Sequence, residues 1–146
     1  MYSKKENQDL KRAFWIAFAE KYPRKWLLYD TKIKDFSFKF YVDNKKAQVL
    51  IDIEPRNNEK RIAYFEKLVA LKTILEDEFV KNLVYEQDFL LDNTKIISRI
   101  WIELPEKGFS NQNNWDLIFD FFYHNMHQLE LFYAEYDEII KDIEVG

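Results

Sequence analysis

The sequence predicts an α+β fold in the order helix, hairpin, helix, hairpin, helix, with an antiparallel sheet of four or five strands, helices mainly on one face and a long C-terminal helix. Two patterns predict it. Apolar residues alternate with polar ones in two adjacent pairs of segments, which is typical of hairpins. Before, between and after these pairs, apolar residues recur at helical spacing. We expect residues 1–146 to form a single α+β domain, because the length suits one domain and no linker-like segment interrupts the chain.

The first element is a helix expected at residues 4–21. Ser3 followed by Glu6 is the pattern of a capping box, and Pro23 marks the end of the helix. The segment at 25–29 is either a short edge strand or a buried loop, and the pattern does not decide between the two.

The first hairpin joins strands at residues 36–42 and 47–53. A two-residue loop at Asn44 and Lys45 would place Phe36 opposite Ile53, with every inward pair apolar. A slip by one residue would place apolar side chains opposite polar ones, so this register is well specified.

A second helix is expected at 59–80, capped by Asn57 or Asn58. It should present Leu and Phe residues to the sheet.

The second hairpin joins strands at 83–91 and 96–104 around a turn at residues 92–93. A two-residue loop there would place Phe89 opposite Ile96 on the helix-covered face. The polar loop at 105–113 then leads to the last helix.

The last helix is expected at residues 114–145, where apolar residues recur every seven positions. Such a helix would be about 45 Å long, whereas a domain of this size has a radius of gyration near ~15 Å. We therefore expect its final two turns either to fray or to be buried by the first helix or by a second subunit. The repeating residues are Trp115, Phe122, Leu129, Tyr136 and Ile143.

Composition excludes several function classes. The chain has no Cys, so thiol nucleophiles, disulfides and cysteine metal sites are excluded, and a cytoplasmic location is favoured. It has two Gly and no glycine-rich phosphate loop, and its net charge is −4. The N-terminus lacks an apolar leader and no run approaches the length of a membrane span. We expect no cofactor and no membrane partner.

Several segments resemble a family of uncharacterised bacterial domains of about this length. They are the run at 25–29, the aromatic strand at 36–40, the segment at 98–103 and the start of the last helix at 114–116. Members of that family occur alone or attached to nuclease-like domains. The resemblance implies a bacterial intracellular domain, an accessory to nucleic-acid processing or defence, and it carries no catalytic residue across.

Asp43, Asp52 and Glu54 invite a comparison with metal-dependent nucleases of the PD-(D/E)xK type. Glu54 stands where that motif has lysine, and the hairpin register places Asp52 opposite Ser37, far along the strand from Asp43. At about 3.3 Å per residue the two aspartates are too distant for one metal ion. A solvated strand edge is the favoured interpretation.

His124 and His127, with Asp120, have the spacing of a metal site on one helix face. Ordinary surface histidines are the favoured interpretation, and we expect no bound metal. The serines at 37, 98 and 110 lack a nucleophile motif, so no catalytic residue is assigned.

Positive charge gathers near the N-terminus, interleaved with Trp26 and Tyr29. This is the best nucleic-acid-like feature of the chain, although Glu6, Asp9 and Glu20 intervene and favour a solvated helix face. The cations are Lys4, Lys5, Lys11, Arg12, Lys21, Arg24 and Lys25.

The second face of the sheet is too apolar for bare solvent and too charged for a core, and Trp, Tyr and Arg are residues that anchor interfaces. The alternative is a face partly covered by the segment at 25–29 or by a helix. We expect a non-enzymatic interaction domain that binds a protein partner or a second copy through this face or the last helix. The other hypothesis is an accessory domain for nucleic-acid processing, or a degenerate nuclease. The candidate binding residues are Lys39, Tyr41, Glu86, Arg99 and Trp101, among neighbours Leu50, Asp52, Val84 and Ile97.

Overall fold

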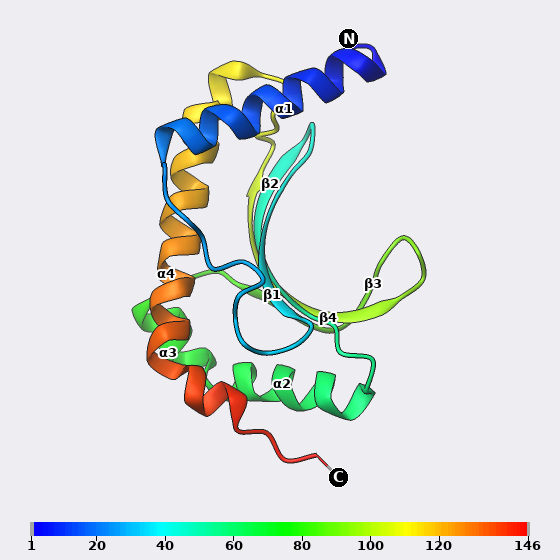
Figure 1. Cartoon of the computed structure of the whole chain (residues 1–146), viewed down its shortest axis with the longest axis vertical. Coiled ribbons are helices and arrows are strands. Elements are labelled where there is room, and N and C mark those ends of the chain that lie inside the picture. Colours follow the sequence, from blue (N-terminus) through cyan, green and yellow to red (C-terminus); the bar gives the residue numbers. More distant parts are fainter. Residues whose placement is uncertain (1, 146) are drawn as a thin grey trace.

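The computed structural model describes residues 2–145 and combines one antiparallel sheet with helices (Figure 1). The capping box at Ser3 and Glu6 is formed at the first helix, and the side chain of Asn57 caps the second. In chain order the elements are α1 (Lys4–Lys21), β1 (Phe36–Val42), β2 (Lys46–Ile53), α2 (Asn58–Ala70), α3 (Lys72–Glu78), β3 (Val84–Leu90), β4 (Ile96–Pro105), the short 3-10 helix η1 (Gln112–Asn114) and α4 (Trp115–Lys141).

The sheet has four strands in the order β1-β2-β4-β3, so the α+β class, the antiparallel sheet and the long last helix are confirmed. It is strongly curved, and α2, α3 and α4 lie on its convex side (Figure 1). The segment at 25–29 is a loop and not a fifth strand. It lies on the outer edge of β1, where the Phe38 N–H donates to the Leu28 carbonyl at 3.0 Å.

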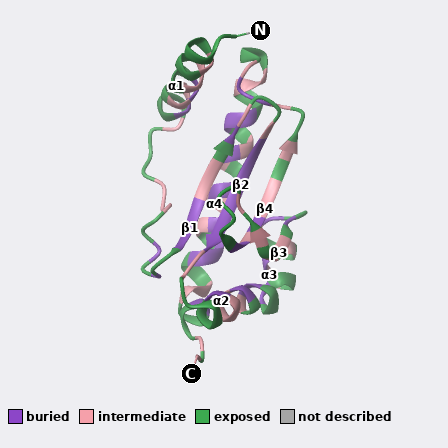
Figure 2. Ribbon diagram, turned by 90° about the vertical axis from the view of Figure 1, so that its right-hand side faces the viewer, coloured by how far each residue is buried: buried purple, intermediate pink, exposed green. Residues whose placement is uncertain are grey.

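The first hairpin has the predicted register. Phe36 lies opposite Ile53 and Val42 opposite Ala47, and the Asp43 N–H donates to the Lys46 carbonyl across a two-residue loop. Figure 2 shows that β2 is buried along almost its whole length, and Phe38 and Ile51, which this register places opposite each other on the convex side, are each 1% exposed.

The second hairpin departs from its predicted register. Its loop has three residues, because the Leu91 N–H bonds the Lys95 carbonyl and Thr94 adopts a positive φ of 69°. A bulge between Glu86 and Phe89 then absorbs the shift. The prediction that Phe89 lies opposite Ile96 on the helix-covered face is wrong: Phe89 pairs with Ile97, on the concave face.

The predicted second helix is divided in two. α2 ends at Ala70 and α3 begins at Lys72, with the break at Leu71. The change of direction brings the end of α3 against α4, where the ring of Phe79 lies 5.5 Å from that of Phe132 and 6.4 Å from that of Tyr136.

Two different regions cover α4. Phe14 of α1 packs near its start, with ring centroids 4.9 Å from Phe119 and 5.4 Å from Trp115. Its end packs against α2 and against Phe79, which follows α3, and Ile140 is fully buried. The prediction for the final two turns is therefore right in one part and wrong in another: α4 ends at Lys141, so the predicted last turn at 142–145 is not helical, whereas Tyr136 packs against Phe79 of the same chain and not against the first helix.

Among residues 2–145, no helix has the length and hydropathy that crossing a membrane requires.

Candidate functional surface

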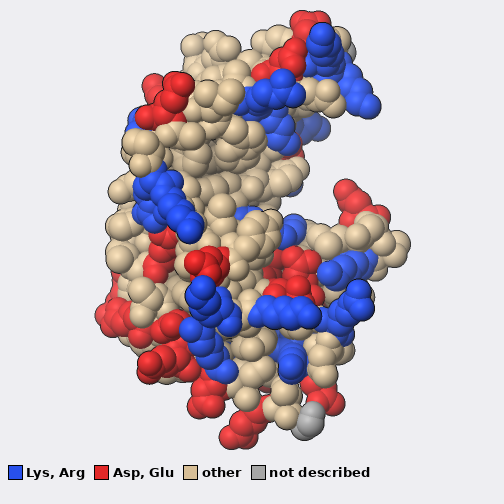
Figure 3. Space-filling view, viewed as in Figure 1, with Lys and Arg blue, Asp and Glu red and all other residues tan. Residues whose placement is uncertain are grey.

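The predicted binding residues share one face of the sheet, which we call the mixed sheet face. The register aligns Lys39, Leu50, Trp101 and Val84 in one cross-strand row, and Ser37, Asp52, Arg99 and Glu86 in the next. Tyr41 lies two residues beyond Lys39 on β1, opposite Gln48. This is the concave side of the sheet, and Figure 3 shows it as a notch between α1 and the β3–β4 hairpin.

An ion-pair network occupies the centre of the mixed sheet face. The Arg99 guanidinium donates to both carboxylate oxygens of Asp52, at 2.7 and 3.0 Å. Lys39 donates to Asp52 and to Glu54, each at 3.0 Å. Asp52 is only 1% exposed, so these bonds compensate for the lost hydration of its charge. Glu86 lies opposite Arg99 in the register, but the guanidinium turns to Asp52.

The environment of Lys39 affects its protonation. Partial burial by itself would lower the pKa of its amine, but the neighbouring carboxylates of Asp52 and Glu54 outweigh it and raise the pKa above its ordinary value of 10.5. Lys39 therefore stays charged and holds the two carboxylates together.

An aromatic cluster adjoins the network. The rings of Phe89 and Trp101 meet edge to face with centroids 5.6 Å apart, and the Arg99 guanidinium lies 4.5 Å from the centre of the Phe89 ring. Sequence reasoning missed Phe89 because it assumed an unbroken strand. The sequence did contain a sign of the bulge, since Glu86, Gln87 and Asp88 are three consecutive polar residues where alternation requires an apolar one.

Arg61 of α2 holds the bulge that turns Phe89 to this face. The residue is 4% exposed, and its guanidinium donates to the Gln87 carbonyl, to Ser98 Oγ at 2.8 Å and to Asp88 at 3.0 Å. Ser98 Oγ also donates to the Gln87 carbonyl, at 2.6 Å. A contact from a helix thus satisfies the carbonyl that a regular ladder would have paired.

The residues considered for metal binding are engaged elsewhere. Asp52 and Glu54 share Lys39, whereas Asp43 lies in the turn and accepts from the N–H groups of Lys45 and Lys46. Within residues 2–145, no three His, Asp or Glu side chains form a group suited to holding a metal ion.

The His124 region is also committed to other contacts. Hydrogen bonds from Tyr22 and Lys21 hold the pKa of Asp120 below its ordinary value. His127 lies 3.3 Å from an Arg24 nitrogen, whereas His124 is exposed.

The N-terminal cations are partly neutralised. Lys21 pairs with Asp120 at 3.0 Å, and Arg24 pairs with Glu130. The Arg24 guanidinium also stacks on Trp26, 3.8 Å from the ring centre. Tyr29 is exposed, and its ring lies 5.9 Å from the Lys39 amine at the border of the mixed sheet face.

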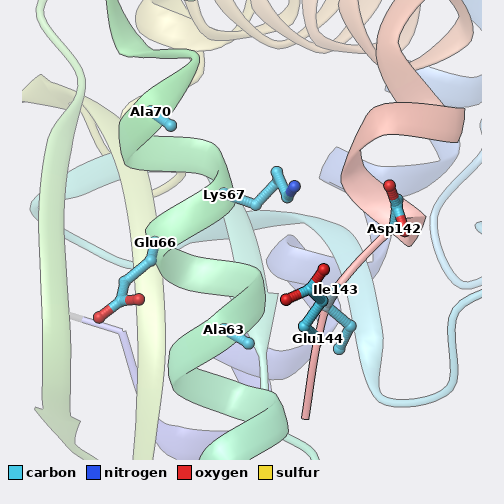
Figure 4. A pocket seen from close by; sticks show the side chains of 7 residues that line it. All are labelled: Ala63, Glu66, Lys67, Ala70, Asp142, Ile143 and Glu144. Atoms are coloured by element: carbon cyan, nitrogen blue, oxygen red, sulfur yellow. The ribbon is translucent and has the colours of Figure 1, made fainter.

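A separate groove lies between α2 and the segment after α4, with a volume of about 370 Å³ (Figure 4). The small side chains of Ala63 and Ala70 leave room for this groove. The Lys67 side chain extends toward the segment after α4, whereas the Glu66 side chain points away from it. Asp142 and Glu144 make its other wall acidic. These groups supply no pairing of a nucleophile with a base.

The chain matches a known protein family. The model of the family described as "Domain of unknown function (DUF4268)" matches residues 10–137. A search of curated proteins finds no match. A search of solved structures finds none either. The resemblance to an uncharacterised domain family is thereby confirmed, whereas the bacterial origin and the association with nucleases remain predictions.

Proposed function

Since the chain belongs to this family of domains of unknown function, we propose its role from its surface: it is a non-enzymatic interaction domain that self-associates through the mixed sheet face. We place this role in the cytoplasm, which the absence of Cys favours, and in a bacterium, which the resemblance of the sequence to a family of bacterial domains implies. The observation that carries the proposal is an aromatic and arginine cluster, Trp101, Phe89 and Arg99, that is partly exposed on a sheet face opposite the helices α2, α3 and α4.

The internal pairing of charges suits this face to an interface. A partner that covers the face would find Asp52 already matched by Arg99 and Lys39, so binding would not bury an unpaired carboxylate. The partly exposed rings of Trp101 and Phe89 would supply apolar contact area beside the network.

The curvature of the sheet limits what can bind. Two concave faces would not fit flat against each other, so the occupant has to be convex. The β3–β4 hairpin projects from the body of the molecule (Figure 1), and Leu90 and Ile96 near its tip are 63% and 49% exposed. The proposed dimer inserts the hairpin of each copy into the mixed sheet face of the other, which gives a closed two-fold assembly.

Sedimentation velocity of variants tests this arrangement. We expect the wild-type chain to sediment as a dimer at micromolar concentration, and both Trp101→Ala and the double variant Leu90→Ser/Ile96→Ser to sediment as monomers. An equimolar mixture of the two variants should recover a weak dimer, because one intact hairpin can then meet one intact face.

Ile139→Ser is the matched control, since Ile139 is a comparably exposed apolar residue on α4, and it should leave the dimer intact. Loss of the dimer in this variant would assign the interface to α4 instead. A wild-type chain that remains monomeric at high micromolar concentration would refute self-association.

The second candidate is an accessory domain in nucleic-acid processing or defence, or a degenerate nuclease. It is favoured by Lys4, Lys5 and Lys11, which lie on one helix and make no ion pair with another described residue. Binding of a single-stranded oligonucleotide that weakens steeply as salt is raised, and that is lost in Lys4→Glu/Lys5→Glu, would support it.

A further inference from the structure

A groove distinct from the mixed sheet face runs along the outer side of α1. It consists of two adjoining hollows of about 540 and 550 Å³ that share Trp15 and Ala19. The first extends along α1 from Gln8, and the second continues past Tyr22 to Trp26 and Phe40. At a rise of about 1.5 Å per residue, the part along α1 from Gln8 to Tyr22 is about 21 Å long.

The floor of this groove is apolar. Ile16 is 54% exposed in it, beside the partly exposed ring of Trp15. The rings of Phe40 and Trp26 close the other end, with centroids 5.3 Å apart. The apolar part of the lining begins at Trp15 and continues to Trp26, on a helix whose other side is packed against α4, and an apolar hollow at such a place is suited to docking.

Cations stand at both ends of the floor. Lys11 and Arg12 line the first hollow, and Arg24 and Lys25 line the second. Residues 4–25 contain seven Lys and Arg against three Asp and Glu. Lys21 and Arg24 are paired with carboxylates of α4, so Lys11 and Lys25 are the lining cations without an ion pair to another described residue. The groove therefore favours a partner with an apolar stripe and carboxylates at its two ends.

The surroundings also restrict the form of the partner. A strand cannot readily extend the sheet here, because the Phe38 N–H at the outer edge of β1 is already bonded to Leu28. Stacking of nucleic-acid bases is disfavoured too. Arg24 already stacks on the Trp26 ring, and Trp15 lies parallel to Phe122 with an interplanar angle of 3°.

We propose that the groove along α1 binds an acidic amphipathic helix of a protein partner, about 14 residues long. Its apolar stripe lies along Ile16 and Trp15, and its carboxylates meet Lys11 and Arg12 at one end and Lys25 at the other. This proposal does not depend on the dimer through the mixed sheet face.

The probe for the test is a fluorescein-labelled synthetic peptide of about 16 residues, with Leu at helical spacing on one face and Glu near both ends. Its anisotropy is followed during titration with the full chain. We expect saturable binding, together with a gain of peptide helicity in circular dichroism. Ile16→Glu and Lys25→Glu should each weaken binding by about tenfold or more.

The control variants are Ile139→Glu and Lys60→Glu, which make the same changes at exposed positions of α4 and α2 and should bind like the wild type. The circular dichroism of every variant must match the wild type before its affinity is compared. The proposal is overturned if a peptide of the same composition in scrambled order binds equally well, or if Ile16→Glu leaves binding unchanged. It is also overturned if a single-stranded oligonucleotide binds the wild type and the acidic peptide does not.

Discussion

The two hairpins of this molecule differ in the length of their loops and in the regularity of their strand pairing. The β1–β2 hairpin closes with a two-residue loop and keeps one register along its whole length. The β3–β4 hairpin closes with a three-residue loop, which shifts its register by one residue until a bulge restores it. The turn of the β1–β2 hairpin is bonded to the loop after β4, where the Phe109 N–H donates to the Asp43 carbonyl. The β3–β4 hairpin instead projects from the body of the molecule (Figure 1).

The difference shows how irregularity can create a surface. A continuous register would have turned Phe89 toward the helices, and the bulge instead places it beside Trp101 and Arg99 on the mixed sheet face. Arg61 compensates for the broken ladder by bonding the Gln87 carbonyl and Ser98. The proposed interface therefore depends on one buried arginine of a helix on the other side of the sheet.

The largest expected effect comes from breaking the junction between the hairpins, where Asp52 of β2 pairs with Arg99 of β4. Asp52→Ala leaves Arg99 and Lys39 without their shared carboxylate, and we expect a loss of about 3–5 kcal/mol in the free energy of unfolding. Urea denaturation measures it. A double-mutant cycle with Arg99→Ala isolates the pair, and a coupling energy near zero would contradict the role of the ion pair.

Removing the anchor of the bulge should be the next largest effect. Arg61→Met leaves the Gln87 carbonyl with fewer donors, and we expect a loss of about 2–3 kcal/mol. NMR contacts between the rings of Phe89 and Trp101 should weaken at the same time. Lys60→Ala, an exposed change on the same helix, serves as the control. Preserved ring contacts in Arg61→Met would show that the bulge forms without the arginine.

The turn of the regular hairpin depends on a close approach by the loop after β4. A Cβ added at Gly108 would lie 2.1 Å from the backbone carbon of Asn44, so the loop would have to move away. We expect Gly108→Ala to destabilise the fold by about 1–2 kcal/mol. Lys107→Ala should be close to neutral in the same thermal unfolding measurement, and equal stability of the two variants would refute the steric argument.

A substitution in the turn of the β3–β4 hairpin should instead stabilise the protein. Thr94 is a β-branched residue held at a φ of 69°, a conformation that glycine adopts without strain. We expect Thr94→Gly to stabilise the protein by up to about 1 kcal/mol, measured by urea denaturation. Asn93→Gly, at a position without a positive φ, should not stabilise it.

The smallest expected effect is on how the stability of the protein depends on pH, because the β1–β2 turn contains a titratable aspartate and the β3–β4 turn uses an asparagine instead. Partial burial alone would raise the pKa of Asp43, but hydrogen bonds from the Lys45 N–H, Tyr41 and the Lys46 N–H outweigh it and lower the pKa below 3.8. This contribution to stability is present above the ordinary pKa of an aspartate and is lost as the pH falls through the lowered value.

The other turn uses the neutral side chain of Asn93, which accepts from the Lys95 N–H and does not titrate. Asp43→Asn should therefore lose less stability than the wild type between about pH 5 and pH 2. Thermal unfolding across this range provides the measurement, and parallel pH curves for the two proteins would contradict it.

Much of the fold could be predicted because the spacing of apolar residues along a strand or helix indicates which of its faces is buried. The alternation in β1 and β2 specified the register through to Val42 opposite Ala47, and the helical spacing located α1 and α4. The five candidate residues of the mixed sheet face were placed together for the same reason. Phe89 was missed because the three-residue loop and the bulge depend on Thr94 and on contacts of Arg61 from another element, although the polar residues at 86–88 already interrupt the alternation.

The sequence by itself determined the α+β class, the regular hairpin and the apolar stripe of α4, because each follows from side-chain spacing along the chain. The tertiary structure decided which helices cover each end of α4, where Leu71 divides the second helix and which face Phe89 occupies. Those outcomes depend on contacts between residues far apart in the chain. The Arg61 guanidinium meets the Gln87 carbonyl only after the sheet and α2 have packed together.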